Sequence, residues 1–282
     1  MSSRGNAGRS SLRPPLFFFF SLLLFFPSVL YAWGEAGHRI VADIADRHLD
    51  DRTRQGIREL IGDASLASVS DWADRIRGER PETARWHFVN IPYQASRYDP
   101  KRDCAFPKKG DCVVAAIGRF RRVVSNRSLS LSERAEALKF LIHLMADLHQ
   151  PLHTADRKDR GGNDLQVTFF GEKLLPNEKP WTLHAVWDGG LIDRTGLLER
   201  AYVDHLQFWI NQQSLFVLQS GTAADWAMES HRAAVEVAYR IPRNRKLSKD
   251  YFEKSLPVMD ALLAKAGVRL ARVLNEAFAR AK

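Results

Sequence analysis

The sequence has few cysteines, only two in 282 residues, and after residue 32 it has no internal repeat and no low-complexity tract. A repeat architecture is therefore not expected. A zinc site built on cysteine alone needs more thiolates than two. Cys104 and Cys112 lie close together in a loop. In an oxidising compartment we expect them to form one disulfide, which would stabilise the fold by about 2–3 kcal/mol.

Acidic residues are absent from residues 1–32, which carry three arginines, then the apolar run LFFFFSLLLFF, then a small residue, Ala32. This order is typical of a secretory signal peptide. A membrane anchor is the alternative, but the run is short for the roughly 20 residues that span a bilayer, and Pro27 interrupts it. We expect a signal peptide at 1–32, a mature domain at 33–282, and a secreted or periplasmic protein that does not stay in the membrane.

Removal of the three signal arginines lowers the formal net charge from +9 to +6. A moderately basic exported protein is compatible with a phosphate-bearing partner. The basic run Arg240–Lys246 could touch nucleic acid, but a solvated charged surface is the simpler interpretation.

The apolar residues of 135–153 recur at helical spacing, which predicts an amphipathic helix. Ser130 and Glu133 are spaced as a capping box at its start. Pro151 should end or kink the helix, because it lacks an N–H and disfavours helical backbone before it. Further on, residues 165–170 alternate like a strand, and together with the residues after Gly171 they predict a small hairpin. A short helix over 70–77 is also expected, with Ser70 as its N-cap.

His143 and Asp147 are four residues apart in the long helix and so share one face. His153 lies just after the break, whereas His149 points away and is interpreted as structural. A single histidine on an apolar helix is more often a hydrogen-bonded core residue than a ligand. The rest of the chain, however, supplies partners of the same type. These are His38, Asp74, His87, the second His–x3–Asp pair His184 and Asp188, and the amine of Trp33 that cleavage after Ala32 would free.

Imidazoles and carboxylates together suit Zn²⁺, and eight such side chains are too many for one tetrahedral ion. Two or three ions are therefore expected, with a carboxylate bridging two of them. Paired ions about 3.5–4 Å apart deprotonate a water held between them near neutral pH and stabilise the leaving oxygen of a phosphoester. The composition of the site thus indicates phosphoester hydrolysis with this hydroxide as the nucleophile.

The chain resembles the zinc-dependent S1/P1 nucleases over essentially all of its mature length. The motifs that carry the resemblance are WGEAGH, SDWADRIR, WHFVNIP, LKFLIHLMADLHQPLH, GGND and LHAVWD. The resemblance implies a mainly α-helical, single-domain fold with three zinc ions. One ion would be held by Asp74, His87, His143 and Asp147. A second would take Trp33, His38 and the bridging Asp147, and the third would take His153, His184 and Asp188.

The resemblance also assigns residues to the substrate. Arg77 matches an arginine that assists at the phosphate, and Phe88 matches an aromatic ring on which a base stacks. The fungal members carry an aspartate that contacts the base where this chain has Asn90, so the base preference is open. Asn163 lies in the GGND loop, which could hold a phosphate beside His153. Asp74, Arg77 and Asp147 are the expected catalytic residues.

The expected activity is endonucleolytic hydrolysis of single-stranded DNA and RNA to 5′-phosphorylated products, with 3′-nucleotidase activity. The enzyme is expected to be a monomer without a stable protein partner. A zinc phospholipase C acting on phospholipid head groups is the alternative, because that family resembles the chain in its N-terminal Trp and three-ion site. Two features disfavour it: the phospholipases end their ligand set in Glu rather than Asp188, and they have a longer gap than that between Trp33 and His38. A non-catalytic zinc-sequestering protein is a third hypothesis.

Overall fold

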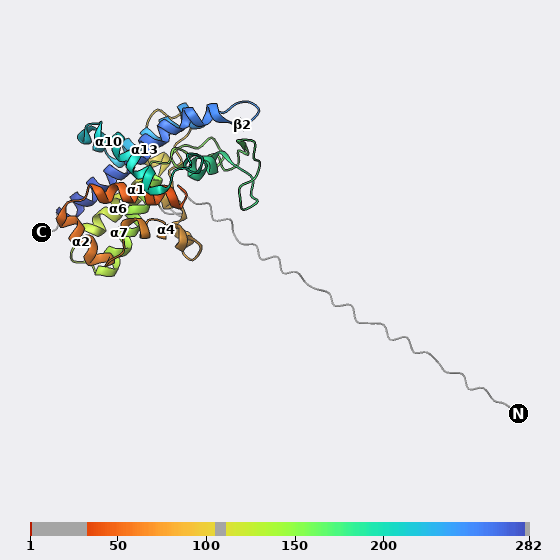
Figure 1. Ribbon diagram of the computed structural model, residues 1–282. Coiled ribbons are helices and arrows are strands. Elements are labelled where there is room, and N and C mark those ends of the chain that lie inside the picture. The colour runs from red at the N-terminus through yellow and green to blue at the C-terminus, as the bar shows by residue number, and fades with distance from the viewer. Residues whose placement is uncertain (2–32, 105–110, 280–282) are drawn as a thin grey trace.

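The computed structural model describes Met1, residues 33–104 and residues 111–279, and the chain in these ranges is mainly helical (Figure 1). The expected signal peptide therefore lies outside the described residues, apart from Met1. The α-helices are α1 (Glu35–Arg47), α2 (Asp51–Ile61), α3 (Leu66–Val69), α4 (Trp72–Arg75), α5 (Pro100–Asp103), α6 (Val113–Ser125), α7 (Leu131–Asp147), α8 (Leu183–Ala185), α9 (Leu191–Arg194), α10 (Glu199–Asn211), α11 (Leu215–Gln219), α12 (Ala223–Ala233) and α13 (Lys249–Ala279).

Short helical turns of other types connect these helices at several points. Three are 3₁₀ helices and two are π-helical turns. They are η1 (Ile76–Gly78), η2 (Pro81–His87), η3 (Pro151–His153), η4 (Val186–Gly190) and η5 (Ala234–Ala238). None of the described helices is long and apolar enough to cross a bilayer.

Helix α7 begins and ends where its sequence predicts. The Ser130 side chain accepts from the Glu133 N–H, and the Glu133 carboxylate accepts from the Ser130 N–H, which completes the capping box. The helix ends at Asp147, four residues before Pro151. Its second half is less amphipathic than expected, because every residue from Phe140 to Gln150 is buried. A helix covered on all sides in this way forms the centre of a core rather than its edge.

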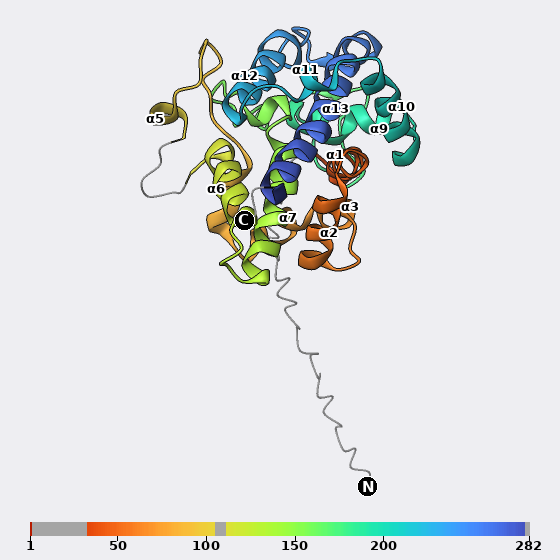
Figure 2. The same ribbon diagram turned by 90° about the vertical axis from the view of Figure 1, so that its left-hand side faces the viewer.

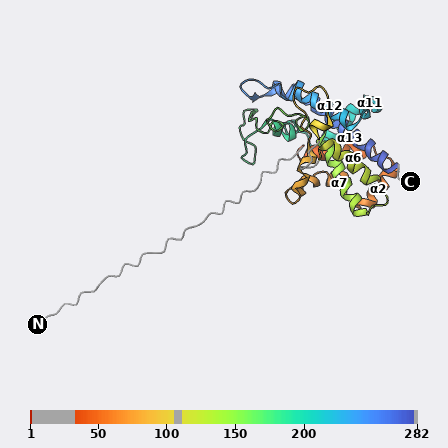
Figure 3. The ribbon, with the colours of Figure 1, turned by 180° about the vertical axis from the view of Figure 1, so that it is seen from behind.

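The long helix α13 crosses the molecule beside α7 (Figure 2). Helix α6 packs along α7 on one side, and α1 packs along α13 on the other; seen from behind, α6 and α7 lie next to each other (Figure 3). The buried apolar side chains of these helices belong to one continuous cluster. The elements that carry the candidate ligands are therefore anchored to a shared core.

Two local expectations need correction. Residues 70–77 do not form one helix capped by Ser70, because the Ser70 hydroxyl donates to the Ala67 carbonyl at the end of α3, and α4 and η1 follow separately. The expected hairpin is present only as isolated antiparallel bridges, such as Gln166 with Thr182. The regular strand pair is parallel and joins β1 (Thr168–Phe169) to β2 (Lys246–Leu247), a partner too distant in sequence for strand alternation to reveal.

The disulfide between Cys104 and Cys112 is present, with an S–S distance of 2.06 Å. It closes the loop that precedes α6, as the sequence predicts.

Glycine at position 267 allows α13 to approach α1 closely. A Cβ atom there would lie 2.4 Å from Ile44 Cγ2 and 3.1 Å from the Val41 carbonyl oxygen.

We expect Gly267→Ala to lower the free energy of unfolding by about 1–3 kcal/mol, because overpacking outweighs the helix propensity gained. Gly118→Ala in α6 is the control: its Cβ would meet only Arg122 Nη1, at 3.7 Å. The control should be neutral or stabilising by up to about 1 kcal/mol. Denaturant unfolding checks both, and equal stability of the two variants would contradict the close packing.

Candidate metal centre

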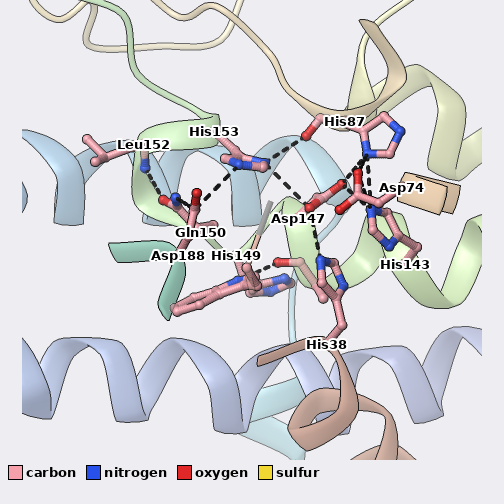
Figure 4. Close-up of polar contacts among 12 residues, drawn as sticks. His38, Asp74, His87, His143, Asp147, His149, Gln150, Leu152, His153 and Asp188 are labelled. Carbon is pink, nitrogen blue, oxygen red and sulfur yellow. Dashed lines mark hydrogen bonds and ion pairs between the residues drawn. The ribbon is translucent and has the colours of Figure 1, made fainter. Parts of the chain in front are cut away.

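The last turn of α7 places His143 and Asp147 on one face, and both side chains are fully buried. The face points toward Asp74 on α4 and toward His87 at the end of η2 (Figure 4). His143 Nε2 lies 3.0 Å from His87 Nδ1 and 3.1 Å from Asp147 Oδ2. His87 Nδ1 lies 3.0 Å from Asp147 Oδ2. Asp74 Oδ1 lies 3.5 Å from His87 Nδ1 and 3.7 Å from His143 Nε2. Four donor atoms from three separate elements thus converge.

These separations fit a tetrahedral metal ion. Two ligands at about 2.0–2.1 Å from one zinc ion lie about 3.3 Å apart. The five distances given for this first cluster range from 3.0 Å to 3.7 Å. Hydrogen bonds join some of these atoms, but the cluster also brings two imidazole nitrogens and two carboxylate oxygens within reach of one point, which is the donor set of a metal site.

A second cluster forms where α1 meets α7. His38 Nε2 lies 3.6 Å from Asp147 Oδ1, and the His38 ring stacks on His143 with 3.9 Å between centroids. Trp33 is fully buried next to this cluster, and its indole N–H donates to the Ala146 carbonyl at 2.9 Å. That bond holds residue 33 against the end of α7, where Asp147 follows.

A third cluster joins η3 to the helical turn at 183–190. His184 Nε2 lies 3.3 Å from Asp188 Oδ2, and His153 Nε2 lies 4.0 Å from Asp188 Oδ1. The rings of His153 and His184 are stacked, with 5.1 Å between their centroids. Asp147 also reaches this cluster, since its Oδ1 lies 3.5 Å from His153 Nδ1. The structure therefore brings together the ligand groups that could hold metal: His38, His143 and Asp147; Asp74, His87 and His143; and His153, His184 and Asp188.

Backbone carbonyls orient three of the imidazoles. The Nδ1 atoms of His143, His153 and His184 lie 2.7 Å, 2.9 Å and 2.7 Å from the carbonyl oxygens of Ser70, His87 and Gly161. Each Nδ1 can donate its proton there, which leaves the Nε2 lone pair facing the cluster.

Several buried donor atoms have no hydrogen-bond partner within the described ranges. They are His38 Nδ1 and Nε2, Asp74 Oδ1, His87 Nε2 and Asp147 Oδ1. A buried polar atom without a partner costs about 1–3 kcal/mol, and more when it is charged. Three of these five atoms, His38 Nε2, Asp74 Oδ1 and Asp147 Oδ1, face the first two clusters, and metal coordination would satisfy them. The residues present therefore fit metal ions.

The electrostatics of the centre favour unprotonated imidazoles at its edges. Burial, together with the neighbouring His143, holds the pKa of His38 well below its ordinary value. Burial likewise lowers the pKa of His184 to about 3. For His143, burial acts in the same direction, but the carboxylates of Asp147 and Asp74 outweigh it and raise that pKa to about 9. Burial raises the pKa of Asp188 well above its ordinary value. A cation in the centre would replace the protons on the last two residues.

The predicted substrate residues lie around this centre at different depths. Arg77 Nη1 lies 3.4 Å from Asp74 Oδ1, and its side chain is 17% exposed, so it lies at the rim beside a buried carboxylate. Phe88 follows the ligand His87 in extended backbone and is half-buried. Asn90 is exposed, and Asn163 has a buried Oδ1 without a partner in the described part of the chain.

Gln150 supports the third ligand cluster, although the sequence pattern did not identify it as a site residue. Its Nε2 donates to Asp188 Oδ1 at 2.6 Å, and its Oε1 accepts from the Leu152 N–H at 2.5 Å. The only feature of the local sequence that could have identified Gln150 is its position directly before Pro151.

Glycine is also required at position 161, whose carbonyl orients His184, because a Cβ there would lie 2.3 Å from the Leu152 carbonyl oxygen and the φ of Gly161 is +61°. His149 has the structural role expected: its Nε2 accepts from buried Arg269 at 3.0 Å.

Comparison with known proteins gives one consistent result. A family model described as S1/P1 Nuclease matches residues 33–279. Endonuclease 2 of Arabidopsis thaliana is 30% identical over 280 residues, which cover 91% of this chain and 94% of that protein. Nuclease S1 of Aspergillus oryzae is 29% identical over 276 residues (87% and 91%), and Nuclease P1 of Penicillium citrinum is 27% identical over 274 residues (86% and 97%). The family match includes all the candidate ligands.

Metal binding should release protons and weaken as the pH falls. The pKa of about 9 at His143 means that this imidazole carries a proton between pH 6 and pH 8.5, which a metal must displace. We expect the apparent affinity for Zn²⁺ to fall about tenfold per pH unit on acidification across this range. The low pKa of His184 means that this residue adds no such dependence there. Calorimetry of chelator-stripped protein in buffers of different ionisation enthalpy measures the protons released, and an affinity independent of pH would contradict the prediction.

Removal of the Gln150 amide should weaken the third cluster selectively. We expect Gln150→Leu to lower metal affinity at His153, His184 and Asp188 by about 10–100-fold, since the variant no longer orients Asp188. Gln207→Leu in α10 is the control: the half-buried Gln207 side chain bonds His48 and Asn211 and none of the candidate ligands, so the metal content should stay unchanged. Metal analysis after dialysis at graded free zinc checks this. Equal retention in both variants would show that Gln150 does not support the cluster.

Proposed function

The chain belongs to the S1/P1 nuclease family and is a phosphodiesterase hydrolase; from this premise, we propose that it is an exported, zinc-dependent endonuclease of single-stranded DNA and RNA. The products would carry 5′-phosphates, and 3′-nucleotides would also be hydrolysed. The observation that carries this proposal is the convergence of four imidazoles on the carboxylate of Asp147.

We propose three zinc ions, one for each ligand cluster. Asp74, His87, His143 and Asp147 would hold the first. His38, Asp147 and the amine of a processed Trp33 would hold the second, and His153, His184 and Asp188 the third. Such ions supply Lewis acidity toward phosphate oxygens and lower the pKa of water at the site. The imidazole and carboxylate donor set, with donor separations of 3.0–4.0 Å, supports zinc.

The protein contributes charge and position to the reaction. Arg77 lies at the rim of the centre beside Asp74, where its guanidinium could bind a phosphate oxygen and assist as charge develops. An arginine fork suits this task because it makes two parallel hydrogen bonds to phosphate. The buried carboxylates of Asp74 and Asp147 would keep the ligand imidazoles in place during turnover.

Phe88 would select unpaired bases. Its ring follows His87 directly and is not among the partly buried side chains that pack against the described core. A base stacked on an aromatic ring gains about 1–3 kcal/mol whatever its identity, and a duplex hides that face. Asn90 and Asn163 would contribute polar contacts to the substrate. Asn90 is proposed because it lies two residues after Phe88 in the sequence. Asn163 is proposed because it follows Gly162, whose carbonyl accepts from the His184 N–H.

Export is proposed on the features of the chain before Trp33. Residues 1–32 have the composition of a signal peptide, and residues 33–282 would be the mature nuclease domain. The disulfide Cys104–Cys112 supports maturation in an oxidising compartment, the periplasm or the cell exterior. We propose that the mature protein is monomeric.

Asp147→Asn tests the proposed chemistry. The amide keeps the shape of the carboxylate but removes the charge that would bridge two clusters, so we expect hydrolysis of denatured DNA to fall at least about 1,000-fold. Asp63→Asn is the control, because Asp63 is exposed in the turn after α2 and belongs to none of the ligand clusters. The same assays on phosphatidylcholine separate a nuclease from a phospholipase. Full activity of Asp147→Asn on DNA, or turnover of the lipid alone, would refute the proposal.

A further inference from the structure

A groove of about 380 Å³ lies beside the parallel strand pair, and none of the candidate metal ligands lines it. Its walls are formed by residues 166–168, 173–174 and 180 on one side and by residues 244–246 on the other. We call it the β1–β2 groove. Its lining includes Gln166, Thr168, Lys173, Asn244, Arg245 and Lys246. The paired strands are 78 residues apart in the sequence, and β-pairing holds them together.

The groove is positively charged and has no acidic lining. Lys173, Arg245 and Lys246 are its three charged residues, and none of the nine described residues that line it is Asp or Glu. Within the described part of the chain these three cations form no ion pair, whereas Arg39, Arg47 and many other surface arginines are paired with carboxylates. A set of unneutralised cations around a concave surface raises the local concentration of anions.

The backbone that carries these cations is fixed. The Thr168 N–H donates to the Arg245 carbonyl at 3.0 Å, and the Phe170 N–H donates to the Leu247 carbonyl at 2.8 Å. Arg245 has a left-handed backbone with φ of 56°, and its N–H donates to the Pro242 carbonyl at 2.9 Å. The Asn244 side chain accepts from the Lys246 N–H at 3.1 Å. Residues 244–246 of the basic run Arg240–Lys246 therefore form a fixed wall of the groove, and they are exposed to solvent as the sequence predicts.

The groove shares a wall with the metal centre. Gln166 in its lining is bridged to Thr182, whose side chain caps α8, and His184 lies two residues further on. The Leu183 N–H donates to the Leu165 carbonyl at 2.9 Å, next to Gln166. In Figure 1, β2 lies at the same end of the molecule as these green segments, with α2 at the opposite end. Backbone pairing therefore connects the lining of the groove to the segment that carries His184.

We propose that the β1–β2 groove binds the phosphodiester backbone of a single-stranded substrate, several nucleotides from the bond that is cleaved. This inference rests on the proposed nuclease function and adds to it a subsite that acts on long substrates only. The lining offers no ring for stacking and no acidic acceptor for base amino groups, so its recognition is by charge and independent of sequence. It would raise affinity for polymers without entering the chemistry.

The test compares a long and a short substrate in two charge-matched variants. The groove variant is Lys173→Gln, Arg245→Gln, Lys246→Gln. The control variant is Arg52→Gln, Arg58→Gln, Arg127→Gln, which removes three exposed arginines on α2 and after α6. Steady-state rates are measured for a 30-nucleotide oligothymidylate and for a thymidine dinucleotide, between 50 and 200 mM salt.

For the groove variant we expect KM for the 30-mer to rise about tenfold at the lowest salt, with kcat unchanged. The slope of log kcat/KM against log salt should become shallower by about 2, since each phosphate contact to a single strand contributes about 0.7. The dinucleotide should be cleaved at the wild-type kcat/KM. If the triple variant does not fold, Lys173→Gln with Lys246→Gln replaces it, with about two thirds of the slope change expected.

An unchanged KM for the 30-mer would overturn the inference while leaving the nuclease function intact. An equal rise in the control variant would overturn it too, because overall charge would then be the cause. Loss of dinucleotide cleavage in the groove variant would mean that these residues act on the centre itself. Loss of binding to phosphatidylglycerol vesicles with unchanged KM would point to a lipid surface instead. If the wild-type enzyme cleaves neither substrate, the proposed function is wrong and the inference falls with it.

Discussion

The structure depends on one buried carboxylate, that of Asp147, at the last turn of α7. Its two oxygens lie within 3.0–3.6 Å of imidazole nitrogens of His38, His87, His143 and His153. A carboxylate without exposure to water is costly unless it is paired, and the alternative is protonation. Although burial opposes ionisation, His143 and the other imidazoles hold the pKa of Asp147 well below its ordinary value. The elements that carry these histidines must therefore pack around the end of α7.

The scaffold keeps those elements in register by burying them rather than by pairing strands. Helix α7 is covered on all sides over its second half, and α13 crosses beside it. Backbone carbonyls at Ser70, His87 and Gly161 then fix the imidazole rotations. Because each carbonyl belongs to a segment that itself carries or adjoins a ligand, the three clusters support one another. Loss of one segment should disturb more than one cluster.

Charge is arranged differently inside the molecule and on its surface. The interior collects carboxylates and imidazoles, a set that attracts metal cations. The rim and the β1–β2 groove instead present arginines and lysines, which suit the polyanion that a nuclease must hold. Because none of the candidate ligands lines the β1–β2 groove, the groove would hold a long substrate without altering the chemistry, whereas Arg77 at the rim would assist it. It also explains how a basic protein can contain so acidic a centre.

The sequence by itself determined the features that local spacing controls. The four-residue separation of His143 and Asp147 follows from the period of the helix, the capping box from Ser130 and Glu133, and the end of α7 from Pro151. The grouping of the distant ligands could be anticipated only through the resemblance to a family. The tertiary structure alone decided the parallel pairing of β1 with β2, the division of the chain after Ser70, and the support of Asp188 by Gln150, 38 residues away. These features depend on which surfaces meet in the folded core, and the period of a single segment carries no information about its partner.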